Sequence, residues 1–93
     1  MHAAVVTVTV DESIDPERKM LREGIIPLVS SQPGFVTGYW LEPVDGHGLS
    51  FAIYDTEANA RGGLDAMEIK PGATPGPGVV IDTTEVREVV GNA

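Results

Sequence analysis

The order of its predicted strands and helices constrains this chain more than any single motif does. Segments in which apolar residues alternate predict strands, and segments in which they recur every three or four positions predict helices. In chain order, the sequence predicts a strand at 3–10, a helix at 16–32, strands at 35–42 and 49–55, a second helix after Asp55, and a last strand at 79–90. This β-α-β-β-α-β order is typical of a ferredoxin-like α+β fold with a four-stranded antiparallel sheet.

The first predicted helix has a recognisable start and an interruption. Asp15 before Pro16 has the form of an N-cap followed by proline at the first helical position, so we expect the helix to begin there. Pro27 lacks a backbone donor and crowds the carbonyl group of Glu23. We therefore expect the helix to bend or to lose a hydrogen bond near Glu23, with Arg18 facing outward.

The second predicted helix leads into a segment rich in proline and glycine. Asp55 or Thr56 can cap this helix, and Ala60 and Leu64 lie on one side of it. The sequence KPGATPGPG at residues 70–78 cannot form a regular helix or strand. We expect it to be a flexible loop.

The composition excludes several classes of partner. Fourteen acidic against six basic residues give a formal net charge of −8, which disfavours binding to nucleic acid or to an anionic membrane surface. The absence of cysteine rules out a disulfide framework and a thiolate metal site. The apolar N-terminal segment stops at Asp11, too short for a signal peptide or a membrane span. We expect a cytoplasmic protein with a single domain over residues 1–93.

The predicted topology places both helices on one face of the sheet and leaves the other face open. Neither face is strongly charged, since the alternating sets include Ala3, Val5 and Thr7 on one side of the first strand. An uncovered apolar sheet of this size exceeds what monomeric proteins normally expose. The same face of a second copy would cover it symmetrically, so we expect a homodimer.

Three stretches of the sequence carry a resemblance to a known family. They are IIPLVSSQPGFVTGYWLEP, DGHGLSFAIYDTEANA and the closing TEVREVVGNA, and the similarity extends over nearly the whole chain. They resemble the antibiotic biosynthesis monooxygenase-like proteins of actinobacteria, whose fold is a dimeric α+β barrel. The most telling piece is the Gln-Pro-Gly-Phe turn before an aromatic strand, which marks the fold and not a reaction.

The resemblance implies two kinds of chemistry to look for. Haem-degrading members of the superfamily use an asparagine near the end of the first strand, a tryptophan on the second helix and a histidine beyond it. This chain has Thr7 and Thr9 on the first strand, no tryptophan on the second helix and no histidine after His47, so haem degradation is not expected. Monooxygenases of aromatic polyketides instead use tyrosine, tryptophan, asparagine and arginine around a pocket between sheet and helices.

Five residues of these types are the candidates for a site. Arg87 and Asn59 are the candidate catalytic residues, because a cation or amide can stabilise a developing anion, and Arg87 would then point inward. Tyr39, Trp40 and Tyr54 are the candidate ligand-binding residues, although adjacent Tyr39 and Trp40 must face opposite sides of the sheet. The ordinary alternatives are an exposed arginine paired with neighbouring glutamates, a surface asparagine, and aromatic residues that only pack.

No metal or cofactor is expected. His2 and His47 are the two histidines, and the sequence brings no other ligand set together. The sequence therefore favours a homodimer that binds a small apolar or aromatic molecule between sheet and helices. Two alternatives stay open: a cofactor-independent monooxygenase of an aromatic or polyketide-like substrate, and a structural dimer without a ligand, in which side chains fill the space beneath the helices.

Overall fold

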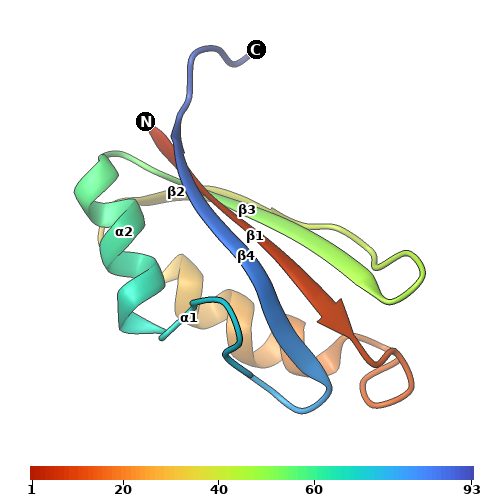
Figure 1. Ribbon diagram of the computed structural model, residues 1–93. Helices are drawn as coiled ribbons and strands as arrows, with labels where there is room; N and C mark the ends of the chain where they lie inside the picture. The colour runs from red at the N-terminus through yellow and green to blue at the C-terminus, as the bar shows by residue number, and fades with distance from the viewer.

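A computed structural model describes residues 1–93 and contains one antiparallel sheet with its helices on one face (Figure 1). The strands lie in the order β2-β3-β1-β4, with β1 in contact with both β3 and β4. The predicted ferredoxin-like β-α-β-β-α-β fold is confirmed. The elements are β1 (His2–Val10), η1 (Leu21–Ile25), α1 (Ile26–Ser30), β2 (Phe35–Trp40), β3 (His47–Tyr54), α2 (Glu57–Ala66) and β4 (Val79–Glu88).

A β-bulge in β2 changes which of its residues face the helices. Phe35 pairs with Tyr54 and Thr37 pairs with Ile53, so Val36 is an extra residue in β2. Phe35 therefore lies on the helix side, where its ring meets the Tyr54 ring edge-on at a centroid distance of 6.0 Å. The strict alternation expected for this strand, with Phe35 and Tyr39 on one face, is wrong for Phe35.

A second bulge lies in β4. Thr83 pairs with Thr7 and Ile81 pairs with Val8, so Asp82 is the extra residue. The Asp82 carboxylate accepts a 2.8 Å hydrogen bond from the hydroxyl of Thr9. Ile81 in turn faces the helices and is buried.

The first helix begins later than the sequence predicts. Residues 12–17 form turns, and Arg18 has a φ of 58°, so regular helical structure begins only at Lys19. The carboxylate of Asp15 nevertheless caps the helix, because its two oxygens accept hydrogen bonds of 3.0 Å each from the backbone N–H groups of Lys19 and Met20. The predicted cap is present, and the predicted start at Pro16 is wrong.

The irregularity expected at Pro27 takes the form of a π-helix. Pro27 has no N–H group, so the carbonyl group of Glu23 lacks its usual helical donor. In η1, just before it, the N–H of Ile26 bonds to the carbonyl oxygen of Leu21, one residue further back than in an α-helix. The helix between Lys19 and Ser30 is therefore wider in its middle than a regular one.

The buried core is small and lies at the end of the sheet that α2 covers. Ala4, Ala52, Tyr54 and Ala60 form it, with exposed fractions of 0–8%. Three of these four side chains are methyl groups, so the core is thin between the sheet and the helices. No helix of the chain is long and apolar enough to cross a membrane.

Candidate functional site

A pocket of about 660 Å³ lies between the sheet and the η1–α1 helix. Most of the residues that line it are hydrophobic. They come from all four strands, from both helices and from the segment between α2 and β4. The lining includes Val6, Val8, Trp40 and Ser50 from the sheet and Leu21, Ile25, Leu64 and Met67 from the helical side.

The pocket exists because the side chains around it are small. Gly48, Ser50 and Ala52 occupy successive helix-facing positions of β3, and Ala4 faces the same way from β1. A Cβ atom built at Gly48 would come within 2.8 Å of a methyl group of Val8, so this glycine allows the close approach of its neighbour. Larger residues at these positions would fill the space with side chains.

Trp40 forms an aromatic wall of the pocket. Its six-membered ring lies over Gly38, where a Cβ atom would come within 2.9 Å of two ring carbons. Glycine at this position therefore lets the indole lie flat against the strand. Across the sheet, Trp40 pairs with Ser50, and Ser50 pairs with Val6 on the next strand. Trp40 is the only tryptophan of the chain.

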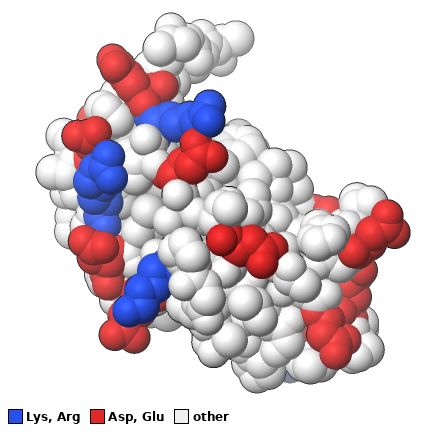
Figure 2. Space-filling view, in the orientation of Figure 1, with Lys and Arg blue, Asp and Glu red and all other residues white.

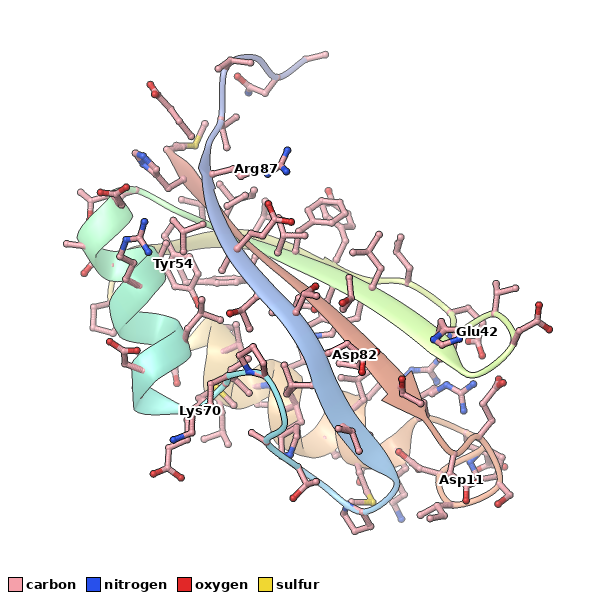
Figure 3. The ribbon with its side chains drawn as sticks, in the orientation of Figure 1. Asp11, Glu42, Tyr54, Lys70, Asp82 and Arg87 are labelled. Carbon is pink, nitrogen blue, oxygen red and sulfur yellow. The ribbon has the colours of Figure 1, made fainter.

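Tyr54, labelled in Figure 3, lies at the α2 end of the pocket and forms a hydrogen-bonded pair with Gln32. The Tyr54 hydroxyl donates to the side-chain oxygen of Gln32, and the side-chain nitrogen of Gln32 donates to the carbonyl oxygen of Gly63 at 2.9 Å. Burial raises the pKa of the Tyr54 hydroxyl above its ordinary value. Tyr54 is therefore a neutral donor at physiological pH.

Arg18 closes the opposite end of the pocket with ion pairs. Its guanidinium group contacts the carboxylates of Glu12 and Glu42, and it donates a 2.8 Å hydrogen bond to the carbonyl oxygen of Asp15. Glu12 also accepts a 3.1 Å hydrogen bond from the backbone N–H of Gly46. The Arg18 side chain is only 12% exposed, so the expectation that it faces outward is wrong.

The two candidate catalytic residues lie outside the pocket. Arg87, labelled in Figure 3, pairs with Ala3 on the open face of the sheet. Its side chain is 72% exposed and donates a 2.6 Å hydrogen bond to Glu85. Asn59 on α2 donates a 2.7 Å hydrogen bond to Asp55. Because neighbouring strand residues alternate between faces, the burial of Ala4 on the helix side places Arg87 on the other side. Arg87 does not point inward.

The three candidate aromatic residues divide between the two faces of the sheet. Trp40 and Tyr54 line the pocket. Tyr39 lies on the open face, where it is 56% exposed and its ring centroid is 5.5 Å from that of Phe51.

Sequence reasoning missed Ser50, Gln32 and Arg18. The alternation of β3 placed Ser50 on the same side as Tyr54, which was a usable signal. Gln32 begins the Gln-Pro-Gly-Phe turn, which marked the fold but not a site, and nothing local marked Arg18. The roles of both depend on contacts with Tyr54 and Glu42, which lie more than twenty positions away in the sequence.

The chain matches one protein family and several solved structures. The family is described as a protein of unknown function (DUF3240), and its model matches residues 16–92. No curated protein matches the chain. The heme-degrader MhuD from Mycobacterium tuberculosis, solved with two hemes bound in its active site, has a TM-score of 0.72 and 18% identity, with 100% of this chain and 99% of that chain covered.

Two further structures share the fold. An arginine-to-serine mutant of MhuD, with two manganese protoporphyrin IX molecules per active site, has a TM-score of 0.60 and 21% identity, with coverage of 100% and 98%. A protein from Deinococcus radiodurans, described as a candidate antibiotic biosynthesis monooxygenase, has a TM-score of 0.56 and 13% identity, with coverage of 100% and 95%. The chain therefore has the fold of the antibiotic biosynthesis monooxygenase-like proteins, the family that its sequence resembles. At sequence identities of 13–21% the similarity concerns the fold.

The pocket offers neither a histidine nor a cysteine to the iron of a porphyrin, and Met20 and Met67 are its only sulfur-containing lining residues. Proteins hold a haem iron through histidine, cysteine thiolate or tyrosine, or through methionine together with histidine. His2 and His47 do not line the pocket, and the chain has no cysteine. The hydroxyl of Tyr54, a further type of iron ligand, is bonded to Gln32 and held neutral by burial.

Proposed function

We propose that this chain, a member of the DUF3240 family of proteins of unknown function, binds a small molecule between its sheet and its helices. The molecule is largely apolar and at least partly aromatic. The observation that carries this proposal is the apolar pocket of about 660 Å³. Pockets for small molecules are commonly about 300–1,000 Å³, with mostly apolar walls and a few polar groups. The flat indole of Trp40 supplies a wall on which an aromatic ring can stack.

The pocket favours binding over a structural dimer without a ligand. A domain of this size normally packs the space between sheet and helices with side chains, because voids forfeit packing interactions. Here the helix-facing positions of β3 carry only small residues, namely Gly48, Ser50 and Ala52. A bound apolar molecule would supply the contacts that these side chains do not make.

The same geometry gives no support to a monooxygenase reaction through the residues expected for it. Such a reaction needs a group that stabilises a developing anion beside the substrate. Arg87 and Asn59 are held by carboxylates outside the pocket. We therefore propose binding without assigning a reaction.

We also infer that a second copy of the chain covers the open face of the sheet. Tyr39, Leu49 and Val36 on β2 and β3 are 56%, 39% and 52% exposed, and the rings of Tyr39 and Phe51 pack against each other there. Contiguous apolar surface of this kind is typical of a protein interface. A two-fold axis would pair the patch with itself.

Binding can be tested through the indole N–H of Trp40, which gives one assignable signal in a proton–nitrogen NMR spectrum. Naphthalene and 2-naphthol serve as uncharged aromatic probes. We expect both to shift the Trp40 signal in a saturable manner. Val6→Phe, which places a ring in the pocket, should weaken binding at least tenfold, and Val44→Phe, on the 69% exposed hairpin turn, should not change it.

Two results would count against the proposal. One is the absence of a saturable shift with both probes in a correctly folded protein. The other is equal binding by the parent, Val6→Phe and Val44→Phe, which would place the probes on the surface. Either result would favour the structural dimer without a ligand.

A further inference from the structure

Ser50 occupies a central position in the pocket. It lies in the middle of β3, between its cross-strand partners Trp40 on β2 and Val6 on β1. Its side chain lines the pocket and is half-buried. Its neighbours on the helix side of the same strand are Gly48 and Ala52, so the hydroxyl stands in apolar surroundings.

The hydroxyl of Ser50 forms no hydrogen bond with the protein. Other unpaired polar atoms of the lining include the buried Nε of Arg18. Tyr54 and Gln32 bond to each other, and Gln32 also bonds to Gly63. Arg18 is held by two carboxylates and two backbone carbonyl oxygens. Apart from Tyr54, Ser50 is the only residue that brings a hydroxyl group to the pocket.

In the free protein water can bond to this half-buried hydroxyl, but a ligand that displaces the water without replacing its hydrogen bond leaves the hydroxyl unpaired, at a cost of about 1–3 kcal/mol. Alanine at this position would line the pocket equally well and carry no such cost. We propose that Ser50 is the specificity-determining residue of the pocket: its hydroxyl bonds to an oxygen atom of the ligand while the ligand ring lies against Trp40. This inference rests on the proposed binding function and names the ligand class more closely.

The charges around the pocket indicate that this oxygen is uncharged. Four carboxylates line the pocket, against two guanidinium groups. One of the two, Arg18, is already paired with carboxylates. An anionic ligand would therefore enter a region of net negative potential, in which Arg22 is the one guanidinium group without a carboxylate partner. A phenol or a ketone fits this surrounding, and a carboxylate does not. The lining carboxylates are Asp11, Asp15, Glu23 and Glu42, and the guanidinium groups are Arg18 and Arg22.

The test compares three naphthalene derivatives that differ in one substituent. In the parent, 2-naphthol should bind about three- to tenfold more tightly than naphthalene, which corresponds to one neutral hydrogen bond. Naphthalene should in turn bind more tightly than 2-naphthoate. Ser50→Ala should remove the preference for 2-naphthol over naphthalene, and Ser50→Thr should retain this preference. Ser31→Ala changes an exposed serine outside the pocket and should behave like the parent.

A second pair of variants tests whether the lining carboxylates disfavour anionic ligands. Glu42→Gln removes a lining carboxylate and leaves Arg18 less neutralised, so the affinity for 2-naphthoate relative to that for naphthalene should rise severalfold. Glu17→Gln removes the same charge from an exposed residue outside the pocket and should have no effect.

The outcomes separate this inference from the proposed function. Binding of naphthalene and 2-naphthol with equal affinity, or a preference for 2-naphthol that persists in Ser50→Ala, would overturn the role of Ser50 and leave the binding function standing. Equal loss of both probes in Ser50→Ala would show a structural effect and also overturn it. Failure of the parent to bind any of the three compounds would overturn the proposed function itself.

Discussion

The phenol hydroxyl of Tyr54 donates a hydrogen bond to the side-chain oxygen of Gln32, and this contact joins the end of β3 to the turn that follows α1. Gln32 passes the connection on to α2 through the carbonyl oxygen of Gly63. One pair of side chains therefore holds the sheet and both helical segments together at one end of the pocket. Elsewhere the helices rest on a thin core, so this pair matters for stability.

Removal of the Tyr54 hydroxyl should destabilise the protein. In Tyr54→Phe the side-chain oxygen of Gln32 loses its donor, and an unsatisfied buried acceptor costs about 1–3 kcal/mol. Urea unfolding followed by circular dichroism should show a loss in this range. Tyr39→Phe removes the same atom from an exposed tyrosine and should stay within about 0.5 kcal/mol of the parent. Equal losses in the two variants would contradict the role of the Gln32 contact.

Stability should also depend on Tyr54 at alkaline pH. Burial raises the pKa of its hydroxyl above the value of about 10 that it has in the unfolded chain. From pH 10 upward the unfolded state therefore binds fewer protons than the folded state, and the free energy of unfolding falls as pH rises. Below pH 10 this contribution is constant. Measured from pH 8 to 11, the free energy of unfolding should fall more steeply in the parent than in Tyr54→Phe. Parallel curves for the two proteins would argue against a contribution from Tyr54.

Two adjacent glycines of α2 should respond in opposite ways to alanine. A Cβ atom at Gly63 would come within 2.6 Å of the Tyr54 hydroxyl oxygen and 2.7 Å of the Gln32 side-chain oxygen, so Gly63→Ala should lower the melting temperature. A Cβ atom at Gly62 would meet nothing within 4 Å. Gly62→Ala should stabilise the helix by about 0.5–1 kcal/mol. Stabilisation by both substitutions would mean that the Tyr54–Gln32 pair moves aside freely.

The two arginine ion pairs should differ in strength because their burial differs. Arg18 is 12% exposed and Arg61 is 59% exposed. Arg18→Gln leaves the carboxylates of Glu12 and Glu42 without their cation and should cost more than 1 kcal/mol of unfolding free energy. Arg61→Gln breaks an exposed pair with Glu57 on α2 and should cost about 0.5 kcal/mol or less. The same urea titration measures both, and a reversal of this order would show that the Arg18 pairs are weak.

The inferred dimer predicts a defined mass. Light scattering at micromolar concentration should give about twice the chain mass of 9.8 kDa. Leu49→Glu places a charge on the open face, where burial against a partner would cost about 3–5 kcal/mol, so the mass should shift toward the monomer. Val44→Glu, on the exposed hairpin turn, should leave the mass unchanged. A parent that is monomeric at this concentration would refute the dimer.

The strand and helix order could be predicted because each element has local signals. The alternation of β1 and β3, the turn residues of the β2–β3 hairpin and the side-chain cap at Thr56 all depend on neighbours in the sequence. The start of the first helix could not be found in this way. Arg18 has a left-handed backbone conformation, and its side chain contacts Glu12 and Glu42. The Asp15-Pro16 pair gives no hint of either feature.

The bulges limited the prediction of the site. An extra residue at Val36 reverses the facing of Phe35 relative to Tyr39, and nothing in the local pattern marks it. The facing of Arg87 depends on its register with Ala3, which only the assembled sheet defines. The pocket itself is formed by small residues on strands that lie apart in the sequence.

Figure 2 shows that acidic side chains are scattered over this side of the molecule, with wide uncharged areas between them.

The π-helix at η1 has a consequence for comparisons between this chain and its relatives. Its i→i+5 hydrogen bond accommodates one more residue per turn than an α-helix does. A relative that lacks one residue between Leu21 and Ile25 could keep the same helix ends and form a regular α-helix there. Alignments should then show a single-residue gap at this place. Beyond that gap, each residue of the relative that faces the pocket would be equivalent in space to a residue of this chain whose position along the helix is one higher.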